Sequence, residues 1–327
     1  MVASDGQLRQ GPAAEVFTVG EQPTPQPAPG EVRVRIRASG ANPSDWKTRK
    51  GGGGRKLIAP LIIPHSDGAG DIDAVGDGVP GSRVGERVWI WNGQWKRPFG
   101  TAAEFICVPA QQAVPLPAQV SYDEGACLGI PAFTAWQAVQ LAALQAGDTV
   151  LVQGGAGSVG HYAIQLAKLR GATVLATVSS EAKAAHARDA GADHAIDYRR
   201  EDVGARVAEL TGGRGVDCVI EMDLAVNGPH YPKLLRPHGR VVVYGMSGVE
   251  ATLPTMWLMQ NSITLKFFLV YDITQADRDA GVRELTELLA AGRLQHTVAL
   301  RLPLAEIARA HELVEGGTLM GNVVLAP

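Results

Sequence analysis

Residues 149–169 read TVLVQGGAGSVGHYAIQLAKL, and this stretch decides the fold. A short apolar and β-branched run, residues 149–152, stands directly before a G-x-G-x-x-G motif that ends at Gly160. A helical pattern over residues 159–169 follows at once. The order strand, glycine turn, helix is the context in which this motif binds a dinucleotide.

Each glycine of the motif has a separate physical task. Gly155 makes the tight turn, Gly157 lets the backbone approach a pyrophosphate, and Gly160 lets the helix pack on the strand. The start of the helix then offers unpaired N–H groups and a positive dipole end to an anion. We therefore expect the motif to bind the cofactor pyrophosphate, against the alternative of a purely structural turn, through Gly155, Ala156, Gly157, Ser158, Val159 and Gly160.

The end of the next predicted strand, residues 173–178, indicates which dinucleotide is bound. An NAD site places Asp or Glu about 20 residues past the motif to bind the ribose 2′-hydroxyl. This chain has Ser179, Ser180 and Lys183 there, which can donate hydrogen bonds to a 2′-phosphate worth about 1.5–3 kcal/mol each. The sequence therefore favours NADPH; the alternative is that Ser179 only caps a helix and Lys183 is solvated.

The rest of the chain shows two kinds of sequence pattern. Residues 121–297 alternate strands (149–152, 173–178, 216–220, 241–244) with helices (159–169, 181–190), which predicts a parallel sheet covered on both faces. Residues 1–120 carry short β runs such as 32–36, 61–63, 87–91 and 105–108, bounded by turn residues, with a glycine loop at 51–54. The C-terminal residues 298–327 again show short β runs and are expected to rejoin the first domain.

Composition excludes several classes of protein. With 327 residues the chain is too long for one ordinary core, and its net charge of -3 argues against a nucleic-acid surface. The polar N-terminus lacks a signal peptide pattern, and no apolar run reaches the length of a membrane span, so we expect a cytoplasmic protein. The three cysteines are too widely spaced for a zinc knot and are expected to be reduced and mostly buried.

Several further segments give the chain a family resemblance. They are residues 41–47 (ANPSDWK), 64–70 (PHSDGAG), 85–88 (GERV), 100–104 (GTAAE), 131–136 (PAFTAW), 153–160 and 321–324 (GNVV). Together they resemble the zinc-free quinone oxidoreductase branch of the medium-chain dehydrogenase/reductase superfamily. The resemblance implies an α/β fold with a GroES-like β domain, at 1–120 and 298–327, and a Rossmann domain, at 121–297. It also implies NADPH, an active site in the cleft between the domains, and a homodimer joined through the sheet edge near residues 262–268.

The positions that hold catalytic zinc in the wider superfamily are occupied differently here. Asn42 and Ser66 stand at two of them, His65 is one residue out of place, and Cys127 would be a lone ligand. A catalytic zinc needs about three protein ligands of the Cys, His or Asp/Glu type. We therefore expect no metal, and a reaction on an acceptor that is already electrophilic.

The resemblance also assigns the site residues. Asn42 is implied to lie beside the nicotinamide ribose and the substrate, and Lys47 is the candidate cation for the developing oxyanion, with a solvated lysine as the equal alternative. Further nucleotide contacts are implied at Thr134, Tyr198, Tyr244, Gly245 and Asn322. An aromatic acceptor pocket is expected from Trp91, Trp95, Phe133 and Phe268, and His161 is expected at the surface.

The function implied is NADPH-dependent reduction of a quinone or a similar conjugated carbonyl by hydride transfer. The alternatives are an enoyl or 2-alkenal double-bond reductase, which uses the same geometry, and a non-catalytic NADPH-binding protein. The expected partners are a small-molecule acceptor and a second copy of the chain, with neither nucleic acid nor membrane.

Overall fold

The structure is a computed structural model that describes residues 10–51 and 58–327. The N-terminal stretch 1–9 and most of the predicted glycine loop at 51–54 lie outside the described residues. The chain divides into two compact units, one of residues 1–131 and 282–327 and the other of residues 132–281. Each unit has its own sheet.

The second unit is built on a six-stranded sheet in which every neighbouring pair is parallel. Its strands are β6 (Thr149–Val152), β7 (Thr173–Val178), β8 (His194–Asp197), β9 (Val216–Glu221), β10 (Leu235–Val243) and β11 (Thr264–Phe267). They pair in the order β11-β10-β9-β6-β7-β8, which is the doubly wound dinucleotide-binding order. The predicted Rossmann sheet is confirmed, and its order reverses between β6 and β9, where such folds bind ligands.

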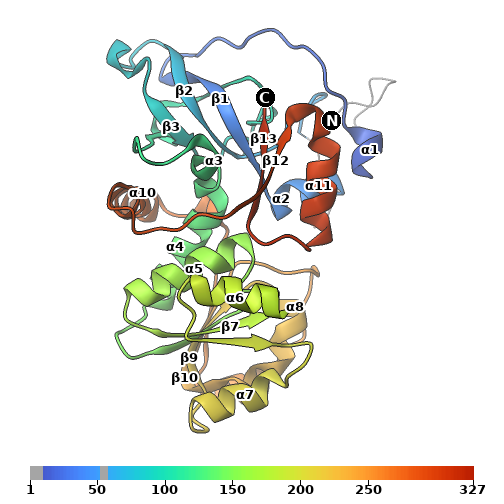
Figure 1. The fold of residues 1–327 in the computed structure, drawn as a ribbon, viewed down its shortest axis with the longest axis vertical. Helices are drawn as coiled ribbons and strands as arrows, with labels where there is room; N and C mark the ends of the chain where they lie inside the picture. The colour runs from blue at the N-terminus through green and yellow to red at the C-terminus, as the bar shows by residue number, and fades with distance from the viewer. Residues whose placement is uncertain (1–9, 52–57) are drawn as a thin grey trace. The chain divides into compact units, whose positions relative to one another are not determined.

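Helices cover both faces of this sheet, with α5 and α6 on one side of it and α7 on the other (Figure 1). The helices of this unit are α4 (Phe133–Ala142), α5 (Ser158–Leu169), α6 (Glu181–Asp189), α7 (Val203–Leu210), α8 (Leu224–Asn227) and α9 (Thr255–Gln260). The unit also includes the first residues of α10 (Gln275–Ala290), which continues past residue 281 into the first unit. Strands buried on both faces should be apolar throughout. Accordingly, Val150, Leu151 and Val152 of β6 and Val219 and Ile220 of β9 are all fully buried.

The first unit is built on a seven-stranded sheet in the order β12-β13-β1-β2-β3-β5, with β4 also paired to β1. Its strands are β1 (Glu31–Ala41), β2 (Asp67–Val75), β3 (Arg87–Ile90), β4 (Phe105–Pro109), β5 (Ala113–Pro115), β12 (Val298–Pro303) and β13 (Asn322–Ala326). Its helices are α1 (Ala13–Val16), α2 (Pro43–Arg49), α3 (Tyr122–Gly125) and α11 (Ile307–Gly316). Residues 61–63, expected among the β runs, form no strand; Ile63 makes only an isolated bridge to Phe99.

Strand β1, which covers the predicted β run 32–36, alternates between buried apolar and more exposed basic side chains. Val32, Val34 and Ile36 are buried, whereas the arginines between them lie on the other face of the sheet. Two of these arginines form ion pairs with the neighbouring strand β2: Arg33 with Asp73, and Arg37 with Asp71, each at 2.8 Å. These pairs neutralise two of the three arginines on this face of β1.

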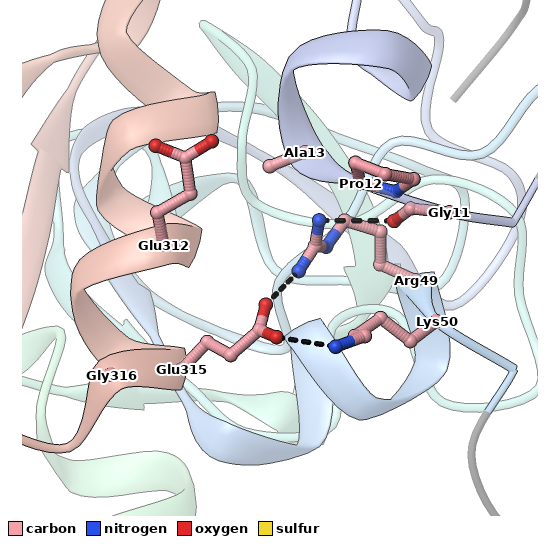
Figure 2. Close-up of a pocket in the computed structure, with 8 residues that line it drawn as sticks. All are labelled: Gly11, Pro12, Ala13, Arg49, Lys50, Glu312, Glu315 and Gly316. Atoms are coloured by element: carbon pink, nitrogen blue, oxygen red, sulfur yellow. Dashed lines mark hydrogen bonds and ion pairs between the residues drawn. The ribbon is translucent and has the colours of Figure 1, made fainter.

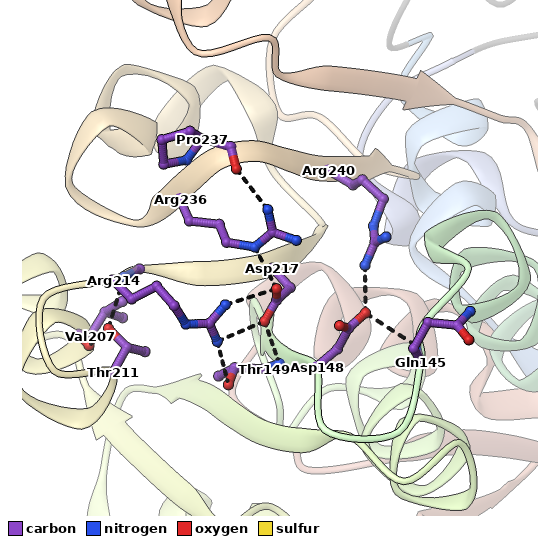
Figure 3. Close-up of polar contacts among 11 residues, drawn as sticks. Gln145, Asp148, Thr149, Val207, Thr211, Arg214, Asp217, Arg236, Pro237 and Arg240 are labelled. Atoms are coloured by element: carbon purple, nitrogen blue, oxygen red, sulfur yellow. Dashed lines mark hydrogen bonds and ion pairs between the residues drawn. The ribbon is translucent and has the colours of Figure 1, made fainter.

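An ion cluster holds together the amino ends of the parallel strands (Figure 3). Asp217 on β9 has a side chain only 5% exposed, and its carboxylate accepts hydrogen bonds from Arg214 at 2.9 Å and Arg236 at 2.5 Å. It also accepts one from the backbone N–H of Thr149, at the start of β6. These hydrogen bonds hold the pKa of Asp217 below its usual range, although burial alone would raise the pKa.

We expect Asp217→Asn to lower the free energy of unfolding by about 2–4 kcal/mol, because loss of the buried negative charge leaves two arginines without their ionic partner. A depressed carboxylate pKa stabilises the fold above the ordinary Asp value of about 3.9, and that contribution is lost as the pH falls below it. Denaturant unfolding at neutral and acid pH should therefore show a variant penalty that shrinks in acid. The exposed partner of Arg206 gives the control: Glu209→Gln should change stability by less than about 0.5 kcal/mol at either pH.

Candidate functional site

The glycine turn is tied to the neighbouring strand β7. The hydroxyl of Thr177 accepts a hydrogen bond from the N–H of Gly154 at 3.0 Å and donates one to Gln153 Oε1 at 2.7 Å. The N–H of Gly155 donates to the carbonyl of Thr177 at 2.9 Å. These bonds fix the turn directly above the carboxyl end of β6, where helix α5 begins at Ser158.

The three motif glycines have different surroundings, and the left-handed φ of 68° in this turn belongs to Gly154 rather than to Gly155. A Cβ on Gly160 would lie 2.3 Å from the carbonyl oxygen of Gly154, and one on Gly155 would lie 2.7 Å from Cβ of Ala176. A Cβ on Gly157 would meet only the oxygen of Gly154, at 3.3 Å. Gly155 and Gly160 are thus required for packing, whereas Gly157 leaves open space over the turn, which is what a bound pyrophosphate requires.

The end of β7 carries the residues expected to bind a 2′-phosphate. Ser179 and Ser180 are half-exposed and follow the last strand residue, Val178. Ser180, rather than Ser179, caps helix α6, and its hydroxyl accepts a hydrogen bond from the N–H of Lys183 at 3.3 Å. Glu181 forms an ion pair with Arg188 at 3.0 Å.

The carboxyl ends of β9 and β10 contain an acid network that the sequence did not reveal. Glu221 is fully buried, and its carboxylate accepts hydrogen bonds from the N–H of Asp223, the amide of Asn227 and the hydroxyl of Tyr231. Asp223 in turn accepts from the N–H and hydroxyl of Ser247 at 3.0 and 2.9 Å. The loops that follow β9 and β10 are therefore held to each other.

Two residues implied to touch the nucleotide lie beside this network. The N–H of Tyr244 donates to the carbonyl of Glu221 at 3.1 Å, and burial raises the pKa of the Tyr244 hydroxyl. A Cβ on Gly245 would lie 2.2 Å from the carbonyl oxygen of Met222, so this position accepts only glycine. Met222 itself, 44% exposed, reaches over the turn, because a Cβ on Gly154 would lie 2.3 Å from its sulfur.

His161 does not lie at the surface, and that expectation is wrong. The side chain is 4% exposed and its ring stacks on that of His186, with 4.6 Å between ring centroids. The periodicity of α5 could not show this, because the face of the helix that holds His161 is covered by α6, a separate element.

The other implied residues of the second unit differ in exposure. Thr134 is buried on α4, and Tyr198 is 52% exposed just after β8. Phe133 is fully buried, with the guanidinium of Arg278 at 4.5 Å from its ring centroid, whereas Phe268 keeps some exposed surface. In this conformation Phe133 therefore has no exposed ring face to offer an acceptor.

In the first unit, Asn42 is buried at the start of helix α2. Its backbone N–H donates to the carboxylate of Asp45 at 2.7 Å, and its side-chain amide donates to Asp67 Oδ2 at 2.8 Å. Burial raises the pKa of Asp67 well above its usual value, and Asp45 raises it further, although the hydrogen bonds from Asn42 and Ile130 lower it. Lys47 lies on the same helix, with its Nζ 5.8 Å from the centre of the Trp46 ring.

The remaining expected residues of this unit are Trp91, Trp95 and Asn322. Trp91 is 7% exposed just past β3, and Trp95 is half-buried in the loop that follows. Asn322 opens β13, and its side-chain amide donates to the carbonyl of Thr297 at 3.1 Å.

A buried histidine pair lies behind Asn42, and the hydrogen bonds fix its tautomers. The hydroxyl of Thr101 donates to the carbonyl of Asp67 at 2.5 Å, so it must accept from Ser39 at 2.9 Å. Ser39 then accepts from His65 Nδ1 at 2.9 Å, which leaves His65 Nε2 to accept from His311 Nε2 at 3.0 Å. Burial keeps both rings neutral, and with neutral rings His311 is the donor and His65 the acceptor between the two Nε2 atoms.

The energetics of this pair agree with the hydrogen-bond directions. Burial lowers the pKa of His65 to about 3. Burial, His65 and Arg49 together lower the pKa of His311 to about 2. His65 also adopts a left-handed φ of 75°, a conformation that favours Gly or Asn over His.

This pair predicts acid sensitivity. Below the ordinary His pKa of about 6.5 the two histidines bind protons in the unfolded chain but not in the folded one. The free energy of unfolding therefore falls as the pH drops. We expect a loss of about 1.4 kcal/mol per histidine per pH unit below that value. The double variant His65→Asn/His311→Leu should remove this slope in denaturant unfolding between pH 7 and about pH 5. The exposed His230→Asn should leave the slope unchanged, and a double variant that keeps the wild-type slope would contradict the assignment of neutral rings.

The first unit also has a hollow of about 440 Å³ lined by Gly11, Pro12, Ala13, Arg49, Lys50, Glu312, Glu315 and Gly316 (Figure 2). Arg49 donates to the carbonyl of Gly11 at 3.0 Å and forms an ion pair with Glu315, which also pairs with Lys50 at 2.5 Å. Three of the charges at its wall, those of Arg49, Lys50 and Glu315, are thus paired with one another. None of the residues predicted for the site lies here.

The described residues form neither a metal-binding cluster nor a membrane-spanning helix. Across residues 10–51 and 58–327, no three His, Cys, Asp or Glu side chains form a metal-binding group. Among the described helices, none combines the length and the apolar character needed to span a bilayer. Cys107, Cys127 and Cys218 are free thiols, as the sequence predicts, and the last two are buried.

Comparison with known proteins gives consistent matches over both units. Residues 28–118 match the alcohol dehydrogenase GroES-like domain, and residues 158–289 match the zinc-binding dehydrogenase family. A quinone oxidoreductase of Pseudomonas aeruginosa is 32% identical over 323 residues, 96% of each protein, and a 2-haloacrylate reductase of a Burkholderia species is 32% identical over 311 residues, 92% of each. The crystal structure of Escherichia coli quinone oxidoreductase complexed with NADPH matches with a TM-score of 0.87 and 28% identity, covering 98% of both chains.

Proposed function

The chain belongs to the quinone oxidoreductase branch of the medium-chain dehydrogenase/reductase superfamily, and from this membership we propose that it reduces a quinone or a similar conjugated carbonyl with NADPH. The observation that carries the proposal is the turn at residues 155–160. It joins a buried parallel strand to a twelve-residue helix and leaves open space over Gly157 alone among its three glycines. That arrangement fits a dinucleotide pyrophosphate.

The residues of this chain would hold NADPH at both ends. The turn, with the N-terminal N–H groups of α5, would bind the pyrophosphate, and Ser179, Ser180 and Lys183 would bind the 2′-phosphate. Thr134, Tyr198, Tyr244, Gly245 and Asn322 are proposed as further contacts. When bound, NADPH supplies the hydride.

The protein's own task is to orient the acceptor and to stabilise negative charge on its oxygen. We assign the orienting contact to Asn42, whose amide is fixed by Asp67. Lys47 on the same helix is assigned as the cation that meets the acceptor oxygen. Trp91, Trp95 and Phe268 are proposed as the aromatic wall, with Phe133 joining only if its ring leaves the packing against Arg278.

We also propose that the reaction needs no metal. Asn42 and Ser66 replace two zinc ligands of the superfamily. His65, the nearest histidine, uses both ring nitrogens in hydrogen bonds to Ser39 and His311. A chelator should leave turnover unchanged, and loss of activity on chelation with recovery on adding zinc would overturn this part of the proposal.

The experiment that tests the function follows the loss of NADPH absorbance with a series of quinones and conjugated enones. We expect NADPH oxidation with quinones, at rates above those with saturated aldehydes or ketones. Tight NADPH binding without turnover on any acceptor would instead show a non-catalytic binding protein.

A second candidate, reduction of a conjugated C=C bond, is favoured by the similarity to the 2-haloacrylate reductase. Hydride addition to a double bond conjugated to a carbonyl places the charge on the same oxygen. If enones or 2-alkenals give a higher kcat/KM than quinones in the same assay, this candidate replaces the first.

We further propose a homodimer formed through β11, the edge strand of the parallel sheet. Phe267 and Leu269, at its end, are 62% and 44% exposed. An unpaired strand edge with exposed apolar residues is a favourable surface for pairing with a second copy. Light scattering should give twice the mass of one chain, and a monomer at all concentrations would contradict the proposal.

A further inference from the structure

Asp67, which the sequence did not single out, accepts a hydrogen bond from the side chain of the proposed site residue Asn42. It is the first residue of β2 and is fully buried. Its Oδ2 accepts hydrogen bonds from the side-chain amide of Asn42, at 2.8 Å, and from the backbone N–H of Ile130, at 3.0 Å. An isolated buried carboxyl costs several kcal/mol, so its retention needs a reason.

The surrounding backbone prevents this carboxyl group from moving. A Cβ on Gly129 would lie 2.4 Å from Asp67 Oδ1 and 2.6 Å from the carbonyl oxygen of Ile90. A Cβ on Gly40 would lie 3.3 Å from Cβ of Asp67. The backbone carbonyl of Asp67 accepts a hydrogen bond from the hydroxyl of Thr101. The oxygen of that hydroxyl in turn accepts a hydrogen bond from Ser39, which is bonded to the histidine pair. Glycines on both sides thus let two backbone segments close around the side chain.

The contact also determines how Asn42 faces a ligand. An Asn amide has one donor end and one acceptor end. The Nδ2 group has two hydrogens, and its partners are Asp67 Oδ2 at 2.8 Å and the carbonyl of Gly40 at 3.5 Å. The amide atom left for a ligand is therefore the oxygen, whose two lone pairs can accept from a ligand as well as from the N–H of Asp45 in the capping box. The backbone N–H of Asn42 is held separately by Asp45, so rotation about the side chain is the one freedom that Asp67 removes.

We propose that Asp67 is the positioning residue for Asn42: it holds the amide so that Asn42 Oδ1 accepts a hydrogen bond from a hydroxyl group of the bound cofactor or substrate. The inference rests on the proposed function, in that it takes Asn42 to be a ligand contact. Asp67 acts through Asn42 and touches no ligand itself. Its contribution is geometric, so an uncharged side chain of the same shape should replace it.

A double-mutant cycle tests this directly. We expect Asp67→Ala to lower kcat/KM for the quinone by about 100-fold, the size of effect that misplacement by about 1 Å can produce, and Asn42→Ala to lower it by a similar factor. The double variant Asn42→Ala/Asp67→Ala should be no worse than Asn42→Ala alone, because Asp67 then has nothing left to orient. Losses that multiply within about twofold would show independent roles and overturn the proposal.

Two further variants separate positioning from folding and from charge. Asp67→Asn keeps the shape and an acceptor oxygen, and we expect kcat/KM within about twofold of wild type; a loss as large as that of Asp67→Ala would show that the charge acts, which also overturns the proposal. This arm remains decisive if Asp67→Ala does not fold. Asp73→Ala, on the same strand, removes an acid that pairs with Arg33 and should leave kcat/KM unchanged.

The dissociation constant for NADPH, measured by fluorescence titration on the same variants, separates failure of this inference from failure of the proposed function. If wild type binds NADPH but reduces no quinone or enone, the proposed function is refuted. The double-mutant cycle can then still be evaluated from the NADPH dissociation constants of the four proteins. If wild type turns over and the cycle is multiplicative in both kcat/KM and the dissociation constant, the function stands and the positioning role of Asp67 is refuted.

Discussion

Gly157→Val is expected to leave the chain folded and to weaken NADPH binding by at least about 100-fold, or about 2.7 kcal/mol. The reason is the open space over this residue: a Cβ there meets only the Gly154 oxygen at 3.3 Å, so the added methyl groups extend to where the pyrophosphate would lie. Calorimetric titration gives the affinity and thermal unfolding reports the fold. Gly157→Ala should fall between wild type and valine.

Two matched variants make this result specific. Gly160→Val should lose stability as well as binding, because its Cβ would lie 2.3 Å from a backbone oxygen and the turn itself must shift. Gly81→Val, at a position with no heavy atom within 4 Å of the added Cβ, should change neither. Undiminished NADPH affinity in folded Gly157→Val would show that the pyrophosphate does not bind on this turn.

Ser179→Asp is expected to reverse the preference for NADPH over NADH. A carboxylate at the end of β7 would repel a 2′-phosphate and would accept a hydrogen bond from a free ribose 2′-hydroxyl. The loss for NADPH should be about 1.5–3 kcal/mol, roughly 10- to 150-fold in the dissociation constant, with NADH binding unchanged or tighter. Because Ser180 caps helix α6, the substitution at Ser179 leaves the cap intact.

Ser179→Asn is the matched control, since it has the size of Asp without the charge. We expect it to reduce NADPH binding far less than Ser179→Asp and to leave NADH binding as in wild type. Equal effects of the two variants on NADPH would mean that the shape of residue 179, rather than its charge, matters. If neither variant changes the preference, the 2′-phosphate lies elsewhere.

The sequence predicts the parallel sheet well because its signals are local. Strands β6 and β7 begin and end at the predicted residues, and α5 begins one residue earlier than predicted, at Ser158. Here the apolar runs, the glycine spacing and the helix start all lie within about one βα unit. β10 was predicted to begin at 241 but begins at Leu235, because its first part contains polar residues and Pro237, which gave no strand pattern.

The buried polar network of the first unit could not be predicted in the same way. His65 and His311 are 246 residues apart in sequence, and nothing in either segment indicates their hydrogen bond. Asp67 stands within the segment that carries the family resemblance, yet its contact with Asn42 depends on the pairing of β1 with β2. The misassigned His161 has the same origin, since a separate helix covers it.

Isothermal titration of the purified chain with NADPH tests the central claim most directly, namely that a dinucleotide binds on the turn at residues 155–160. We expect one site per chain, with NADPH bound more tightly than NADH and binding abolished by Gly157→Val. No heat of binding with NADPH, from a chain shown to be folded, would contradict the account.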